Sequence, residues 1–383
     1  MISLYVHIPF CASRCPYCDF ATAPATSPLR ARYLAALGAE IAREGEALGH
    51  PAVGTAFFGG GTPSLLEPGE IAALGEAISG AFDFVPDEVT FEANPATLDR
   101  ARLEAWRRLG ATRVSLGAQS FSAAGLQALG RTHTVGDIGP AVVAARSVGL
   151  DVNLDLIFGR PGETEADWDA DLSAALACGP DHLSAYPLEL ELAPEEAVAN
   201  WPGDWPTLAR WRLSAAAAQA DDDGQARRYE HASARLAARG YRHYEIANWA
   251  RPGKECRHNL QYWRNAAWLG VGAGAHSHLA GVRSHQPAGL LAYILRVERG
   301  DGRITDGDAD AAVDTAILAL RLDEGLDLAA YGERFGAAAR ARVDGALRPF
   351  DGTGVLERRG ERVSLSEHAR FVASDVFVRL LPE

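Results

Sequence analysis

Six short apolar segments alternate with helical stretches rich in Ala, Leu and Arg over roughly the first 190 residues, and this alternation constrains the fold more than any other feature. Strands joined by helical crossovers pair in parallel, so the pattern predicts a parallel sheet. We expect strands at 3–8, 55–60, 88–94, 113–120, 151–159 and 182–190. We expect helices at 30–48, 68–80, 99–109, 122–129, 136–148 and 164–178, several of them after Ser, Thr or Asp in capping positions.

A sheet of this kind belongs to the α/β class, and it either opens as a doubly wound sheet or curls toward a barrel. Both arrangements place a functional site at the carboxyl ends of the strands. Polar residues follow the expected strands at that edge: Glu92, Asn94, Gln119, Ser120, Asp155 and Tyr186. Any one of them is equally well explained as a cap of the next helix, but their recurrence after successive strands favours a site.

The second half of the chain is less regular. We expect one long helix near 207–239 and a strand at 243–250. Beyond residue 305, three helices, a hairpin at 354–366 and a final helix predict a small winged-helix-like domain. No basic stripe marks its recognition face, so we expect this domain to dock rather than to bind DNA.

The charge balance limits the partners of the chain. With 37 basic and 50 acidic side chains the net charge is -13, which disfavours binding to phosphate backbones or to an anionic membrane surface. No apolar run reaches the roughly 18 residues of a membrane span. The first residues carry neither a basic segment nor a cleavage site, so we expect a cytoplasmic protein without an integral membrane segment.

Three of the five cysteines, Cys11, Cys15 and Cys18, form a C-x3-C-x2-C array just after the first expected strand. Closely spaced thiolates in a loop converge on one inorganic centre, as iron-sulfur clusters require. Zinc, with His7 as a fourth ligand, is an alternative, and buried passive thiols are another. A 4Fe-4S cluster held by three cysteines leaves one iron open to a ligand that is not protein.

This array resembles that of the radical S-adenosylmethionine (SAM) superfamily. The resemblance implies a partial (β/α)6 TIM-like barrel, a 4Fe-4S cluster on Cys11, Cys15 and Cys18, and SAM bound to the open iron. In that family an electron from the cluster cleaves SAM to a radical, so an electron donor is an implied partner. The resemblance also implies a core over 1–230, a bridging segment over 231–300 and a C-terminal domain over 301–383.

Further segments match positions that hold SAM in the branch of the superfamily related to coproporphyrinogen oxidase. The segment FFGGGTPS resembles the one that holds the amino group of SAM, and its glycines admit a ligand close to the backbone. The residues implied to bind SAM are Tyr5, Tyr17, Gly60, Gly61, Thr62, Glu92, Gln119, Arg131 and Asp155. The chain has Arg160 where relatives more often have Leu, which puts one local contact in doubt.

Within this branch the resemblance narrows to oxygen-independent coproporphyrinogen III oxidase and its relatives, the heme chaperones. The oxidase carries a longer N-terminal segment and a further cysteine two positions after the third, where this chain has Phe20. The segment HNLQYW, residues 258–263, matches the HNxxYW motif of the chaperones. Imidazole is a common axial ligand of heme iron, so the resemblance assigns heme binding to His258.

We therefore predict a heme chaperone, related to the proteins of porphyrin biosynthesis, that transfers heme to an acceptor protein and carries a 4Fe-4S cluster and SAM. Three alternatives remain open at this point. The chain is an enzyme of the coproporphyrinogen dehydrogenase type, a SAM-dependent oxidoreductase; or it is a radical methylase; or it is a zinc-bound regulator that uses its C-terminal domain on DNA.

Overall fold

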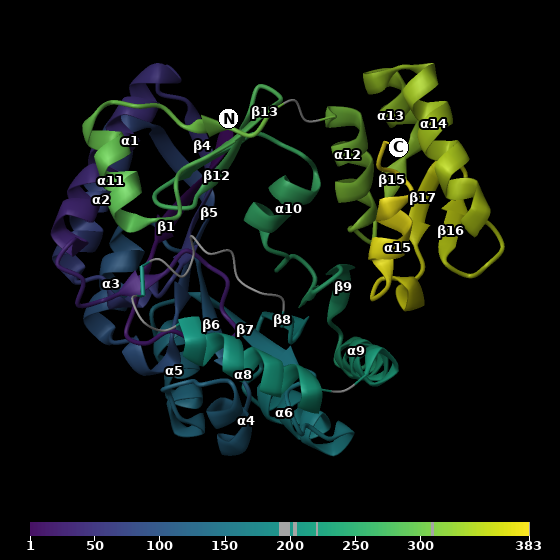
Figure 1. The fold of residues 1–383 in the computed structure, drawn as a ribbon, viewed down its shortest axis with the longest axis horizontal. Coiled ribbons are helices and arrows are strands. Elements are labelled where there is room, and N and C mark those ends of the chain that lie inside the picture. The colour runs from purple at the N-terminus through teal and green to yellow at the C-terminus, as the bar shows by residue number, and fades with distance from the viewer. Residues whose placement is uncertain (191–199, 202–204, 220, 308–309, 383) are drawn as a thin grey trace.

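The structure is a computed structural model that describes residues 1–190, 200–201, 205–219, 221–307 and 310–382. Its centre is a run of six parallel strands joined by helices, as the alternation predicts (Figure 1). The strands in spatial order are β1 (Ile2–Ile8), β4 (Ala52–Gly60), β5 (Asp83–Ala93), β6 (Arg113–Gln119), β7 (Asp151–Phe158) and β8 (His182–Pro187).

Most of the crossover helices begin where capping side chains satisfy free backbone N–H groups of the first turn. In one of them, Asp167 N donates to Thr164 Oγ1 over 3.1 Å while the Asp167 side chain bonds back to Thr164, which forms a capping box. The helices are α1 (Arg30–Ala47), α2 (Pro68–Ala81), α3 (Arg100–Arg108), α4 (Ala123–Ala128), α5 (Val135–Ser147) and α6 (Glu165–Ala177). All six agree with the ranges expected from the sequence.

Additional strands extend the sheet beyond both ends of the parallel run, and the sequence did not predict this extension. On the β1 side the order continues outward through β11 (Trp268–Val271), β12 (His276–Leu279), β13 (Val282–His285) and β14 (Ile304–Thr305). On the β8 side it continues through β10 (Asn248–Ala250) and β9 (Arg242–Glu245). In the described residues β1 and β8 therefore pair with these added strands and not with each other.

Two expected elements are wrong. The helix expected over 207–239 is two helices, α8 (Trp205–Ala218) and α9 (Asp222–Ala237), because Asp221 starts a new helix by accepting from Gly224 N over 2.8 Å. The strand expected over 243–250 is the antiparallel pair β9 and β10, in which Ala247 N donates to Glu245 Oε1 at the turn. Alternating apolar residues do not reveal such a turn.

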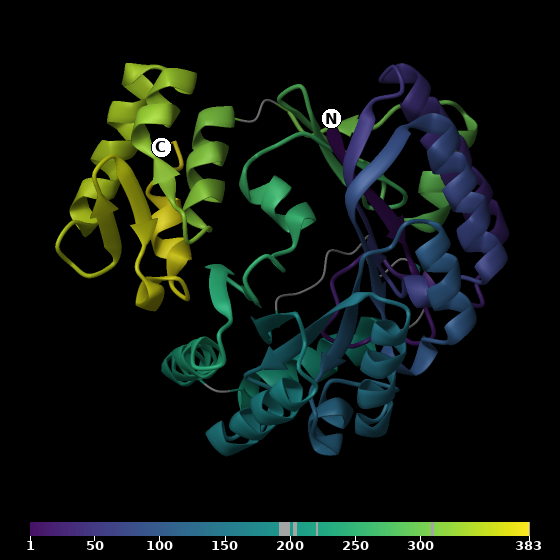
Figure 2. The same cartoon turned by 180° about the vertical axis from the view of Figure 1, so that it is seen from behind.

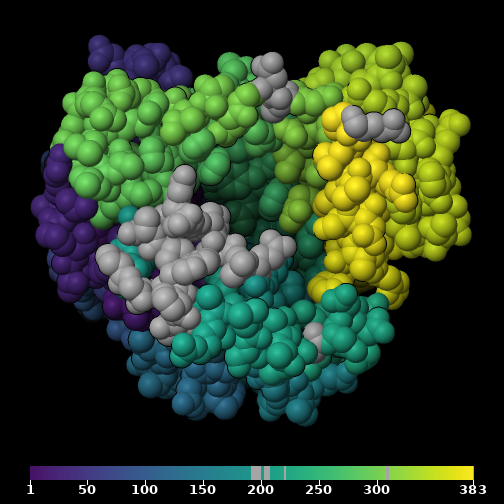
Figure 3. Space-filling view, viewed as in Figure 1, coloured from purple at the N-terminus to yellow at the C-terminus, as the bar shows by residue number. Residues whose placement is uncertain are grey.

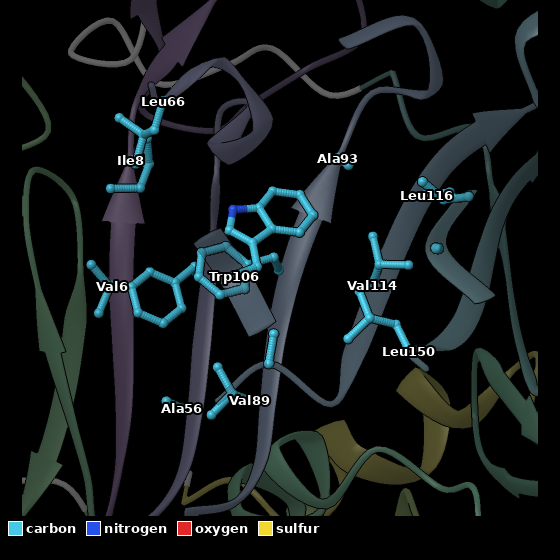
Figure 4. Close-up of a cluster of buried hydrophobic side chains, with 14 of the residues drawn as sticks. Val6, Ile8, Ala56, Leu66, Val89, Ala93, Trp106, Val114, Leu116 and Leu150 are labelled. Atoms are coloured by element: carbon cyan, nitrogen blue, oxygen red, sulfur yellow. The ribbon is translucent and has the colours of Figure 1, made fainter. Parts of the chain in front are cut away.

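The core lies between the sheet and its helices, and a stack of three aromatic rings marks its centre (Figure 4). Phe58 and Phe91 on neighbouring strands lie with ring centroids 4.2 Å apart, and Phe91 stacks on Trp106 of α3 at 4.6 Å. Each such pair contributes about 0.5–1.5 kcal/mol beyond its buried area. The stack fixes α3 against the strands whose ends carry the site.

The C-terminal segment has a separate core and a three-stranded sheet, in the order of elements expected for a winged-helix-like domain. Its elements along the chain are α12 (Ala311–Leu320), β15 (Leu326–Asp327), α13 (Leu328–Phe335), α14 (Ala337–Leu347), β16 (Leu356–Arg359), β17 (Arg362–Leu365) and α15 (Ala373–Val378). Strands β16 and β17 form the predicted hairpin. The α/β class and the separate C-terminal domain are thus confirmed, while the curl into a partial barrel and the three domain boundaries stay predictions.

One short helix, α10 (Arg257–Trp263), lies between the main sheet and the C-terminal domain in both views (Figures 1 and 2). It carries the HNLQYW segment. Just after it, Asn265 Nδ2 donates to Thr315 Oγ1 of α12 over 2.9 Å, and Arg321 lies 4.4 Å from the centre of the Trp263 ring. Helix α10 therefore joins the two parts of the molecule.

Candidate functional site

A cavity of about 520 Å³ opens at the carboxyl ends of the parallel strands, where the sequence placed the site. Eleven of the residues implied by the resemblance line it together: Cys11, Cys15, Tyr17, Cys18, Gly60, Gly61, Thr62, Glu92, Gln119, Arg131 and Asp155. Asn94 and Tyr186 line it as well. The other two implied residues, Tyr5 and His258, are not among the lining residues.

The cysteine loop starts from a short parallel pair, β2 (Phe10–Cys11) and β3 (Ala23–Pro24). All three cysteine residues are partly exposed, and two of their sulfur atoms have hydrogen-bond donors: Thr62 Oγ1 donates to Cys11 Sγ over 3.4 Å, and Arg131 Nη1 donates to Cys15 Sγ over 3.3 Å. Burial raises the pKa of Cys11 to about 11 and that of Cys18 to about 12. Thiolates here need the positive charge of a metal centre, which the donor set fits.

Two side chains from far along the chain hold the cysteine loop, and the sequence analysis missed both. Arg212 of α8 donates to Pro16 O over 3.0 Å and forms an ion pair with Asp19 at 2.5 Å. Trp201 Nε1 donates to Thr22 O over 2.9 Å. Nothing in the sequence around Arg212 or Trp201 distinguishes these residues from ordinary surface positions, so no local signal identifies them.

The glycine segment at the end of β4 brings the backbone close to the other walls of the cavity. Gly60 has φ +107°, which favours glycine, and a Cβ at this position would collide with the His7 ring. A Cβ on Gly61 would lie only 2.6 Å from Pro9 C. Gly60 N donates to Glu92 Oε2 over 2.9 Å. The glycines therefore allow a tight approach of chain segments beside the cavity, and their contact with a ligand stays a prediction.

Two carboxyl groups, Glu92 and Asp155, face the cavity from neighbouring regions of the sheet. Burial and the nearby charge of Asp155 raise the pKa of Glu92 to about 7. Burial also raises the pKa of Asp155, whose oxygens accept from Ser115 Oγ and Asn153 Nδ2 at 2.8 Å each. Among the described residues neither carboxyl has a salt-bridge partner. A ligand with a positive charge or an amino group fits these groups.

Gln119 and Arg131 have features that are typical of a binding site. Gln119 has φ +62°, a left-handed conformation that is uncommon outside glycine and that often marks functional positions. Arg131 Nη2 donates to Gly117 O over 3.0 Å, but its buried Nε has no hydrogen-bond partner within the described part of the chain. An unpartnered guanidinium N–H beside a cavity fits a ligand carboxylate. The site as a whole thus fits an amino acid-like cofactor beside a metal cluster.

The remaining sequence candidates have structural roles. Ser120 donates to buried Asp171 over 2.8 Å, and Arg160 forms ion pairs with Asp171 and Glu163 at 2.6 Å each. Arg160 therefore stabilises the loop after β7 and is not among the residues that line the cavity. His7, the proposed fourth zinc ligand, contacts Ala21 O through Nε2 at 2.7 Å and Tyr5 Oη through Nδ1 at 3.0 Å. Both of its nitrogens are already engaged.

His258 is fully buried, and both of its ring nitrogens have partners. Thr55 Oγ1 donates to Ser3, so it accepts from His258 Nδ1 at 2.9 Å, and His258 Nε2 accepts from Tyr262 Oη at 2.8 Å. Burial lowers the pKa of His258 to about 3, so the ring is neutral. Tyr5 lies near His258, because the Tyr5 ring stacks on Phe57, whose ring also contacts that of His258. In this conformation His258 offers no free lone pair to iron.

Comparison with known proteins agrees with this geometry. Residues 5–175 match the model of the Radical SAM superfamily, and residues 308–372 match that of the HemN C-terminal domain. The solved structure of coproporphyrinogen III oxidase (HemN) from Escherichia coli superposes with a TM-score of 0.84 at 22% identity, covering 99% of this chain and 89% of that one. The chain thus has the radical SAM fold and the HemN fold.

Curated relatives narrow the family. The chain is 39% identical to the heme chaperone HemW of Mycobacterium tuberculosis (strain CDC 1551 / Oshkosh), over 99% of this chain and 94% of the relative. It is 30% identical to the heme chaperone HemW of Bacillus subtilis (strain 168), over 100% of both chains. The chain belongs to the HemW family, which confirms the resemblance found in the sequence. Membership of the superfamily implies a 4Fe-4S cluster and SAM as cofactors.

A search of the helices in the described residues finds none that is both long enough and apolar enough to cross a membrane.

Proposed function

We propose that the protein is a cytoplasmic heme chaperone that binds heme and transfers it to an acceptor protein. The observation that carries this proposal is the similarity to proteins named heme chaperone HemW over 99% of the chain. Phe20 supports it, because this side chain stands where the related oxidase has a further cysteine. It is 62% exposed at the rim of the cavity. The organisation into a core over 1–230, a bridging segment over 231–300 and a C-terminal domain over 301–383 is part of the proposal.

The cavity is proposed to hold the cluster and SAM. Cys11, Cys15 and Cys18 would ligate the cluster, with Thr62 and Arg131 donating to its sulfur ligands. The SAM site would comprise the lining residues that the resemblance assigns to SAM, which are Tyr17, Gly60, Gly61, Thr62, Glu92, Gln119, Arg131 and Asp155, and Tyr5 outside the lining. When reduced, such a cluster supplies one electron to SAM. The chain itself provides buried acceptors for a cationic group and an unpartnered Arg131 N–H for a carboxylate.

Heme is proposed to bind at α10 through His258, and the structure sets a condition for this. The Nε2 lone pair already accepts a hydrogen bond from Tyr262, so this bond must break before the nitrogen reaches iron. The surface is hollowed between the core and the C-terminal domain (Figure 3), the region where α10 lies. Opening of α10 toward this hollow would expose His258 together with the flat rings of Tyr262 and Trp263.

The test is an anaerobic heme titration of cluster-reconstituted protein, followed by heme transfer to an apo-acceptor protein. The His258→Ala variant is expected to lose stoichiometric heme binding while its cluster stays intact, since the two sites use different segments. A His368→Ala variant is the matched control, because this histidine lies exposed on the C-terminal domain. Equal heme binding by the wild type and His258→Ala would remove His258 from the proposal, and no transfer by the wild type would remove the chaperone.

A radical SAM enzyme that acts on a tetrapyrrole is the second candidate. The observation that favours it is the cavity, which still gathers eleven of the residues implied for the cluster and SAM. Protein supplied with SAM, an electron donor and coproporphyrinogen III distinguishes the two candidates. Decarboxylated product with weak heme binding would replace the chaperone by an oxidoreductase of the coproporphyrinogen dehydrogenase type.

A further inference from the structure

Two histidines and one aspartate gather on strands β12, β13 and β14, outside the cavity described above. His276 opens β12 and His285 ends β13, and the two are directly opposite each other in the antiparallel register. Their ring centroids lie 5.4 Å apart. Asp306 follows β14, and its backbone N–H donates to Arg283 O over 3.0 Å, which fixes this residue beside the two rings.

The carboxylate of Asp306 faces both imidazoles. Its Oδ1 contacts His285 Nδ1, and its Oδ2 lies 3.8 Å from His276 Nδ1. One ligand atom from each of the three residues lies within 4.8 Å of the others. The His276 side chain is 68% exposed, so solvent reaches the group directly. Arg283, whose positive charge acts on His276, is paired with Asp314 at 2.8 Å, which offsets its charge.

We propose that His276, His285 and Asp306 form a binding site for a divalent transition metal ion, with Zn²⁺ as the best match. Two imidazoles and one carboxylate are ligands that suit such ions, and three protein ligands leave a position for water. Ligand distances of roughly 2.0–2.2 Å require the three atoms to draw closer together. Rotation of the exposed His276 ring and of the Asp306 carboxylate provides this movement.

The position of Asp306 gives the site a consequence for the fold. Asp306 is held to β13 through its backbone bond to Arg283, and α12 of the C-terminal domain begins shortly afterwards, at Ala311. A bound ion would tie three strands together where the chain leaves the core. It would therefore restrain the connection between the core and the C-terminal domain without touching the cysteine loop.

The test uses the full chain with its cluster reconstituted anaerobically, so that Cys11, Cys15 and Cys18 are occupied. Titration with Zn²⁺ alone, followed by calorimetry and by elemental analysis after dialysis, is expected to give one Zn²⁺ per chain. His276→Asn and His285→Ala are each expected to weaken Zn²⁺ binding by at least about tenfold. Even replacing a residue that only orients a metal ligand lowers the affinity by that much. Zn²⁺ is also expected to raise the Tm of the wild type and not that of His285→Ala.

The control variant is His231→Ala, which removes another exposed histidine that pairs with a carboxylate, Asp169 at 2.7 Å. It is expected to bind Zn²⁺ as the wild type does, because no third ligand stands beside that pair among the described residues. Retained cluster absorption shows that each variant is folded. Zn²⁺ binding that is equal in wild type and His285→Ala, or absent from the wild type, would overturn the proposal.

Discussion

The cavity at the strand ends and the helix α10 differ in how completely their buried polar groups are hydrogen-bonded. In the cavity, the buried Arg131 Nε has no hydrogen-bond partner among the described residues, and the carboxyls of Glu92 and Asp155 accept hydrogen bonds but form no salt bridge there. In α10, His258 is fully buried and has a partner at each ring nitrogen. The unpartnered Arg131 N–H and the burial of the two carboxyls carry a free-energy cost that a ligand can remove, whereas a ligand at His258 must first break existing bonds.

This difference separates two kinds of binding. The cavity is preorganised, so a ligand that matches its charges gains the interactions without rearranging the chain. Heme binding at α10, as proposed, requires release of His258 first, so the apparent affinity would be reduced according to the fraction of molecules in which His258 is released. The following predictions test that contrast.

The largest effect is expected at the cysteine loop. Cys15→Ala should abolish the cluster, because two remaining thiolates do not hold a 4Fe-4S centre. Iron content and visible absorption after anaerobic reconstitution measure this loss. Cys178→Ala, which changes a cysteine outside the loop, should keep both signals, and a Cys15→Ala variant with wild-type absorption would contradict the assignment.

A smaller loss is expected on removing one charge from the cavity. Glu92→Gln keeps the shape of the side chain but removes its negative charge, and charge-assisted hydrogen bonds contribute about 1.5–3 kcal/mol. SAM affinity should therefore fall about 10- to 100-fold by calorimetry. Glu104→Gln, at an exposed glutamate paired with Arg100, should leave the affinity unchanged. If both variants bind SAM equally well, Glu92 does not contact the ligand.

A gain of affinity is expected at α10. Tyr262→Phe removes the hydroxyl that occupies His258 Nε2 and retains the ring. A hydrogen bond contributes about 1 kcal/mol net, so heme affinity should rise about fivefold. Tyr331→Phe removes a comparable hydroxyl within the C-terminal domain and should change nothing. An unchanged or weaker heme affinity in Tyr262→Phe would mean that this bond does not oppose heme binding.

The last effect concerns acid stability, and it is smallest near pH 7 because it arises only as the pH falls below 6.5. Burial lowers the pKa of His258 to about 3, so folded His258 stays neutral while the unfolded chain takes up a proton below pH 6.5. Its contribution to stability is complete above pH 6.5 and declines as the pH falls toward 3. In His258→Gln the slope of unfolding free energy against pH in that window should decrease by up to about 1.4 kcal/mol per pH unit. Denaturant unfolding at a series of pH values measures the slope, and equal slopes would contradict the buried neutral ring.

The sequence predicted the six parallel strands and their helices because buried strands and capped helices leave local patterns. It did not predict that the segment after α10 adds β11 to β14 to the sheet, because the pairing of β11 with β1 joins residues far apart in the chain. The sequence also did not predict the turn between β9 and β10, because the hydrophobic pattern continues across it. Side chains, rather than glycine or proline, stabilise this turn.

The sequence likewise predicted one part of the candidate site and not another. Cysteine spacing and polar residues at strand ends were enough to gather the cavity, because parallel strands bring their carboxyl ends together. The support of the cysteine loop by Arg212 and Trp201 was not predictable, since their contacts depend on how a distant segment folds back. The burial of His258 was not predictable either, because a motif does not show whether its side chain faces solvent or Thr55.

Strand β4 carries a consequence of its own. Thr55, near its start, holds His258, and Gly60, at its end, holds the carboxyl of Glu92. A strand in the middle of a sheet does not stretch, so β4 holds its contact with His258 and its contact with Glu92 at a fixed separation of about five residues. A displacement of β4 would therefore move the contact with His258 and the contact with Glu92 together.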